Sequence, residues 1–165
     1  MFEAIKTYTQ KMAATRFIGK KYASGGDAWG EWKEKKLFES VKARIGTTAQ
    51  HEDGDALIGL MCHRHGFEYW LGYFTPAGTT VPEGLDYEDF PAMPIAVCWF
   101  YEKDEDNHDL AAEALANIEN TGHVVTTDWW FERYAIKRCK NFFKAEIPTD
   151  TIMDVGYFIE GKKDE

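Results

Sequence analysis

The order of predicted secondary structure occurs twice along the chain, and this doubling constrains the fold more than any other feature. In the first half, Ala13–Tyr22 is predicted to form a strand. Apolar residues then recur at helical spacing from Trp29 to Ile45, with Lys and Glu between them. Two strands follow over residues 57–64 and 67–75, and a short turn at His65-Gly66 joins them. The first half therefore reads strand, helix, strand, strand.

The second half repeats this order after a linker rich in Pro, Gly and Thr, Pro76–Gly84. A strongly apolar strand is predicted over Pro94–Tyr101, and a helix over residues 108–121. Two further strands are predicted at Trp129–Ile136 and Thr151–Glu160. The two halves share little residue identity, so the repetition is one of architecture.

We expect an α+β fold within one domain, residues 1–165. Repeat one covers about 12–76, the linker about 77–86 and repeat two about 87–160, while residues 1–11 form a helical or loose lead-in. Each unit can cover only one sheet face with its helix. Pairing the units therefore gives one antiparallel sheet with the helices on one side, and a central groove between the halves is a natural ligand site.

Charge and cysteine content limit the classes of function. The chain has 28 acidic and 19 basic residues, a net charge of −9. An acidic surface repels phosphate backbones, so we expect no direct contact with nucleic acid. Cys62 and Cys98 lie in apolar runs and make an odd number with Cys139, which is typical of buried free thiols in a reducing compartment. No apolar leader and no run of about 18 apolar residues is visible, so we expect a cytoplasmic protein without membrane contact.

One carboxylate lies inside an aromatic strand, Trp129–Tyr134. Residues two apart on a strand share a face, so Trp130, Glu132 and Tyr134 are predicted to project together. Arg133 then points the other way. A carboxylate between aromatic rings is costly to desolvate unless a cation or a hydrogen-bond donor faces it. A flat, apolar cation would meet it through both charge and ring faces.

The alternative is that Glu132 pairs with a neighbouring Lys or Arg on a half-exposed sheet. Burial among rings would raise the pKa of Glu132, and a cationic partner would lower it, and the sequence leaves both open. Glu68 offers a second carboxylate, which we expect to be solvated or ion-paired.

Aromatic residues make up 15% of the chain, which suits either the lining of a pocket or a densely packed core. Trp29 and Trp32, on the first predicted helix, are expected to pack against the sheet. Four others are predicted to form the groove wall beside Glu132, with core packing as the alternative for each: Trp70, Trp99, Trp130 and Tyr157.

Metal binding and cysteine catalysis are both disfavoured. His63 and His65 share a strand face, with His51 upstream, but no Cys or carboxylate is placed as a third ligand. Cys62 directly precedes His63, and adjacent residues of a strand point to opposite faces, so this thiol and this imidazole are not placed to act together. We predict neither a metal nor a cofactor.

Three segments resemble the GyrI-like small-molecule-binding domain, the effector-binding half of some AraC- and MerR-type multidrug regulators, which also occurs alone. They are Phe90–Val97 (FPAMPIAV), which opens the second repeat, Phe131–Tyr134 (FERY), and Ile152–Ile159 (IMDVGYFI). The likeness covers about residues 12–160. It implies an aromatic pocket in which the family's glutamate, here Glu132, meets cationic or polar ligands.

Two departures from the family pattern concern the groove. Pro94-Ile95 replaces the aromatic residue often found before Ala-Val. The segment after Tyr134 is longer and more basic than the family pattern, so it could cap the groove or give Glu132 an internal partner. Its cations are Lys137, Arg138, Lys140 and Lys144.

The resemblance implies a stand-alone binder of amphipathic, cationic aromatic compounds with Glu132 as the anchor. An alternative is a hydrolase of strained cyclopropane-containing natural products, in which Glu132 activates water and Tyr134 or Tyr69 donates to the developing oxyanion. Another is gyrase inhibition through a protein contact. If the chain regulates transcription, it must act through a partner. The implied ligand-binding residues are Glu132, Tyr134, Trp130, Trp70, Tyr69, Trp99 and Tyr157.

Overall fold

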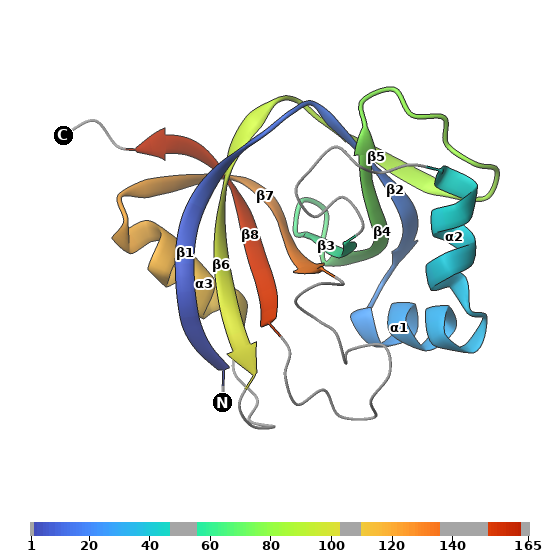
Figure 1. Ribbon diagram of the computed structural model, residues 1–165, viewed down its shortest axis with the longest axis horizontal. Coiled ribbons are helices and arrows are strands. Elements are labelled where there is room, and N and C mark those ends of the chain that lie inside the picture. Colours follow the sequence, from blue (N-terminus) through green and yellow to red (C-terminus); the bar gives the residue numbers. More distant parts are fainter. Residues whose placement is uncertain (1, 47–55, 103–109, 136–151, 163–165) are drawn as a thin grey trace.

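The computed structural model describes residues 2–46, 56–102, 110–135 and 152–162, and these form an α+β fold, as predicted. Eight strands make one antiparallel sheet in the order β1-β6-β8-β7-β3-β4-β2-β5. The strands are β1 Phe2–Met12, β2 Thr15–Tyr22, β3 Leu57–Cys62, β4 Glu68–Pro76, β5 Asp86–Phe90, β6 Met93–Glu102, β7 His123–Tyr134 and β8 Ile152–Lys162. The helices are α1 Gly25–Glu34, α2 Leu37–Ile45 and α3 Leu110–Asn120 (Figure 1).

Both predicted repeats are present, as β2–α1–α2–β3–β4 and β6–α3–β7–β8. In each repeat the last strand pairs between the other two: β4 lies between β3 and β2, and β8 lies between β7 and β6. The two halves meet where β3 pairs with β7 in antiparallel orientation. The centre of the sheet is therefore a junction between two similarly connected units.

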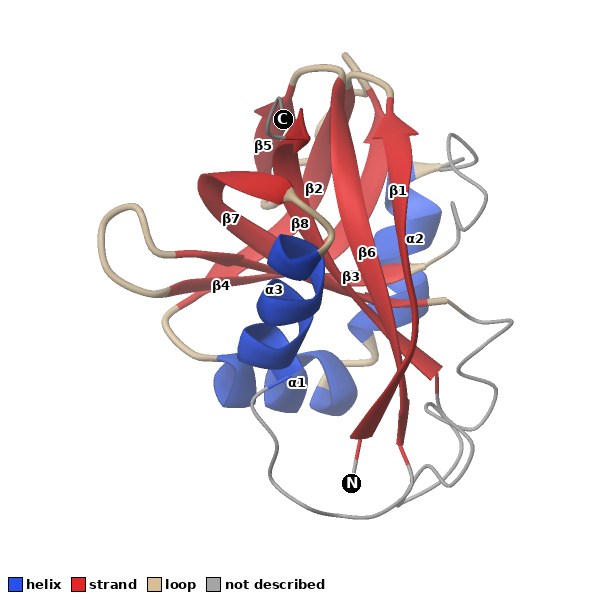
Figure 2. Cartoon of the chain, turned by 90° about the vertical axis from the view of Figure 1, so that its left-hand side faces the viewer, coloured by secondary structure: helices blue, strands red, loops and turns tan. Residues whose placement is uncertain are grey.

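The outer strands differ from the prediction. Residues 2–12 are not a helical or loose lead-in, because β1 pairs with β6 along its length (Figure 2). β5 begins at the end of the predicted linker and pairs with β2. The short breaks between β1 and β2 and between β5 and β6 face each other, since Met12 pairs with Met93 and Thr15 pairs with Phe90. β1 has no continuous apolar run, so only its pairing with β6 identifies it as a strand.

The single helix predicted from Trp29 to Ile45 is two helices, α1 and α2. Lys36 between them has φ 53°, a left-handed conformation that interrupts a continuous helix. α1 begins earlier than predicted, because the Ser24 hydroxyl caps it by accepting a hydrogen bond from the backbone N–H of Asp27. Gly46 follows α2 with φ 87°.

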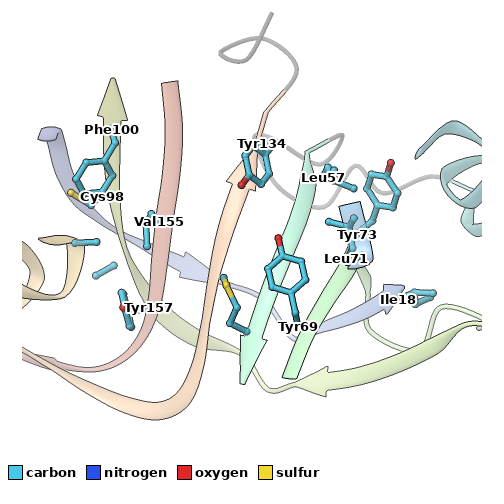
Figure 3. Close-up of a cluster of buried hydrophobic side chains, with 14 of the residues drawn as sticks. Ile18, Leu57, Tyr69, Leu71, Tyr73, Cys98, Phe100, Tyr134, Val155 and Tyr157 are labelled. Carbon is cyan, nitrogen blue, oxygen red and sulfur yellow. The ribbon is translucent and has the colours of Figure 1, made fainter. Parts of the chain in front are cut away.

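Apolar side chains cover both faces of the sheet, which explains the nearly continuous apolar runs of β3 and β4. The side chains of all three helices pack into the core on one face, which we call the helix face; Figure 3 shows part of it. Trp32, Val41 and Ile118 belong to this core. The other face, the opposite face, carries a separate core that includes Phe17, Phe74, Phe90, Phe131 and Phe158.

Candidate functional site around Glu132

Glu132 lies at the junction of the two halves. Its neighbours across the sheet are Gly59 on β3 and Val155 on β8. α3 packs on β6, β7 and β8, whereas α1 packs on β2 and β4 and α2 on β4 (Figure 1). Val155, which pairs with Glu132, and Tyr134, two residues further along β7, belong to the helix-face core, whereas the adjacent Phe131 belongs to the opposite-face core. Glu132 is thus on the helix face, between the helix of one half and the helices of the other.

The Glu132 side chain is half-buried and has one polar partner among the described residues. The Tyr134 hydroxyl donates a hydrogen bond of 2.6 Å to its Oε2. Burial raises the pKa of the Glu132 carboxyl, and the Tyr134 hydrogen bond opposes that rise without cancelling it. No described Lys or Arg pairs with Glu132. Arg133 points to the opposite face, as predicted, where its Nε donates to Asp154 over 2.7 Å.

Gly59 leaves room beside the carboxyl group. A Cβ at this position would lie 2.4 Å from the Tyr69 hydroxyl oxygen and 3.5 Å from Oε2 of Glu132. The Tyr69 hydroxyl thus occupies the space of the missing side chain. Trp29 Nε1 on α1 donates a hydrogen bond of 2.9 Å to this hydroxyl. The Trp29 ring also meets the Tyr134 ring edge-on, with 5.2 Å between centroids.

Three aromatic residues from α1, β4 and β7 therefore contact one another, and the two tyrosines among them lie beside the carboxyl group. Tyr69 and Tyr134 project from the same face of the sheet (Figure 3). Burial and the nearby charge of Glu132 both raise the pKa of Tyr69, so its hydroxyl stays protonated at neutral pH. Gly59 was not among the residues predicted for the site, although a glycine inside an apolar strand signals close approach of another group. Trp29 was expected to pack against the sheet, and Trp29 does so at this site.

Trp130 and Tyr157 form a second ring pair on the helix face, next to Glu132 along the sheet. Their rings stack with 5.9 Å between centroids and an interplanar angle of 14°. The Tyr157 hydroxyl donates to the carbonyl oxygen of Ala111 on α3. Trp130 is half-buried, and its Nε1 donates to Nε2 of His63 over 3.2 Å. These two predicted residues therefore share the face of Glu132.

Trp70 and Trp99 lie on the opposite face, so the structure does not bring them together with Glu132. Trp70 is buried in the opposite-face core and donates from Nε1 to Glu68. Glu68 also lies 3.9 Å from Lys21, as expected for an ion-paired residue. Trp99 packs against the same core and donates to the Tyr8 hydroxyl over 3.2 Å. Core packing, the alternative considered for both, is what the structure shows.

Metal-ligating groups, thiols and cavities away from Glu132 were also considered as sites. No group of three or more metal-ligating side chains occurs among the residues that the structure describes. Cys62 and Cys98 are buried free thiols, as predicted. A cavity of about 240 Å³ lies elsewhere, and its lining does not include Glu132: Thr7, Tyr8, Thr9, Ala96, Thr121 and His123. No described helix is both long and apolar enough to cross a membrane.

Some predictions fall outside the described residues. These concern Cys139, His51 and the basic segment after Tyr134, with Lys137, Arg138, Lys140 and Lys144.

The sequence matches no family model and no curated protein. Its fold is similar to solved structures of low identity. A protein from Staphylococcus aureus MU50 has a TM-score of 0.65 and 13% identity over 95% of this chain and 99% of that chain. SAV2435, solved with tetraphenylphosphonium bound, has a TM-score of 0.67 and 13% identity over 95% of each chain. The C-terminal domain of EcmrR has a TM-score of 0.59 and 11% identity over 94% of this chain and 97% of that domain. The chain therefore has the fold of the GyrI-like small-molecule-binding domain, the effector-binding fold that its sequence resembles.

Proposed function

We propose that this chain binds amphipathic aromatic cations on the helix face, with Glu132 as the anchor for the positive charge. The observation that carries the proposal is a half-buried carboxyl group without a cationic partner in the described part of the chain. Burial raises the pKa of Glu132, so holding it ionised costs free energy in the empty protein. A bound cation would offset that cost.

The rings around Glu132 suit such a ligand. Tyr134 donates to the carboxyl group, Tyr69 lies within reach of its charge, and Trp29 packs against both tyrosines. The stacked rings of Trp130 and Tyr157 lie beside this group. A cation over an aromatic face gains about 0.5–2 kcal/mol, so several rings together with one charge pair are enough for micromolar affinity. SAV2435, whose fold is similar, was solved with the lipophilic cation tetraphenylphosphonium, which supports the same ligand class here.

Binding is tested by quenching of tryptophan fluorescence with tetraphenylphosphonium and with neutral triphenylphosphine oxide. Glu132→Gln keeps the shape of the side chain and an acceptor for Tyr134 but removes the charge. We expect it to weaken binding of the cation about tenfold or more, equivalent to about 1.4 kcal/mol, and to change binding of the neutral compound less than threefold.

Glu68→Gln is the matched control, because Glu68 is also a half-buried carboxylate on a strand but has Lys21 and Trp70 as partners. It should leave both affinities unchanged. Equal losses for the cation and the neutral compound in Glu132→Gln would contradict the anchor role. Conversion of a strained cyclopropane electrophile that stops in Glu132→Gln, while binding persists, would instead favour a hydrolase.

A further inference from the structure

The hydroxyl group of Tyr69 has a single polar partner among the residues that the structure describes. An indole N–H can only donate, so in the 2.9 Å contact with Trp29 Nε1 the Tyr69 oxygen is the acceptor. The hydrogen of the Tyr69 hydroxyl must point elsewhere, and no described atom accepts it. Trp29 thereby fixes Tyr69 as a donor at this site.

The neighbouring polar groups do not use this hydrogen. The Tyr134 hydroxyl directs its own hydrogen to Oε2 of Glu132. The Tyr69 oxygen and Oε2 of Glu132 lie 2.4 and 3.5 Å from the position that a Cβ of residue 59 would take, yet no hydrogen bond joins these two oxygens. The Tyr69 hydroxyl, which fills the space beside Gly59, thus carries a hydrogen that no described atom accepts, and the carboxyl group of Glu132 lies close to it.

A buried donor without an acceptor is unfavourable, and a ligand that supplies an acceptor removes this penalty. We propose that the ligands of this site carry a hydrogen-bond acceptor, such as an ether or carbonyl oxygen, a few bonds from the cationic centre, and that Tyr69 selects for it. This inference rests on the proposed function, because it places the positive charge at Glu132. Tyr69 is then a specificity-determining residue, and the site distinguishes among cations of equal charge and size.

The test uses two cations that differ in one atom group. Butyltriphenylphosphonium and (2-methoxyethyl)triphenylphosphonium have chains of equal length, but the second has an ether oxygen where the first has a methylene. We expect the wild-type protein to bind the methoxyethyl compound at least fivefold more tightly, measured by tryptophan quenching or calorimetry. In Tyr69→Phe this preference should disappear, so that the two cations bind with equal affinity.

Tyr73→Phe is the matched control. Tyr73 lies on the same face of β4, and its hydroxyl donates to the carbonyl oxygen of Phe38 over 2.7 Å, so the preference should persist in this variant. A preference retained in Tyr69→Phe would overturn the role of Tyr69. Equal binding of both cations by the wild type would overturn the inference and leave the proposed function intact, and this comparison needs no variant to fold. Binding of neither cation would contradict the proposed function and the inference together.

Discussion

Replacing Gly59 by alanine tests the packing of the site most directly. The added Cβ would lie 2.4 Å from the Tyr69 hydroxyl oxygen and 3.1 Å from Cζ, so the ring must move by about 1 Å to reach ordinary contact distance. That movement breaks the hydrogen bond from Trp29, at a cost of about 0.5–1.5 kcal/mol. Overpacking adds about 1–3 kcal/mol. Lower entropy of the unfolded chain offsets about 0.4–1 kcal/mol.

We therefore expect Gly59→Ala to lower the free energy of unfolding by about 1–3 kcal/mol and to weaken binding of tetraphenylphosphonium. Urea unfolding followed by circular dichroism measures the first effect, and fluorescence quenching the second. Gly30→Ala is the control, because Gly30 is exposed on α1 and a Cβ there would meet nothing within 4 Å. It should stabilise the protein by about 0.5–1 kcal/mol and leave binding unchanged. If the free energy of unfolding of Gly59→Ala lies within 0.5 kcal/mol of the wild-type value and the variant binds tetraphenylphosphonium normally, then Tyr69 does not pack closely against Gly59.

Three further predictions concern charge and packing elsewhere in the fold. Because burial raises the pKa of Glu132 above its unfolded value, the ionised carboxylate destabilises the folded state at pH 7. Glu132→Gln should therefore raise the free energy of unfolding at pH 7, and the difference from the wild type should vanish as the pH falls below 4.5. Hydrogen bonds from Tyr22, Lys35 and Lys20 lower the pKa of Glu31 to about 2. The stability that the ionised Glu31 contributes above pH 4.5 should therefore be lost as the pH falls from 4.5 to about 2. Glu31→Gln should flatten the plot of unfolding free energy against pH in that window, and above it the plots of variant and wild type should run parallel. Gly156→Ala should lower the free energy of unfolding by about 3 kcal/mol or more, because the added Cβ would lie 2.2 Å from Cζ of the buried Phe131. The variant that does fold should bind tetraphenylphosphonium normally. A loss of affinity would show that the two faces of the sheet are coupled.

Much of the fold could be predicted because strand and helix periods are local properties of the sequence. The alternation in Trp129–Tyr134 placed Trp130, Glu132 and Tyr134 on one face, where the structure has them. The same rule could have excluded Trp70 from the groove, since it follows Tyr69 directly and must point to the other face.

Other features could not be predicted because they depend on segments far apart in the chain. β1 is a strand only through its pairing with β6, and its own sequence does not distinguish it from a polar lead-in. The break at Lys36 leaves the apolar helical spacing intact, so the pattern predicts one helix where the chain forms two.

The sequence alone determined that a carboxylate shares a strand face with aromatic rings, because neighbouring side chains of a strand alternate in direction whatever the rest of the chain does. Only the tertiary structure decided what surrounds that carboxylate. Trp29 and Tyr69 are 40 residues apart and meet through the packing of α1 on β4, and Gly59 faces Glu132 because the two halves join at β3 and β7. Arg133 is directed to Asp154 on the other face, so the adjacent cation does not neutralise Glu132. The chemical character of the site thus comes from long-range packing, which local periodicity does not encode.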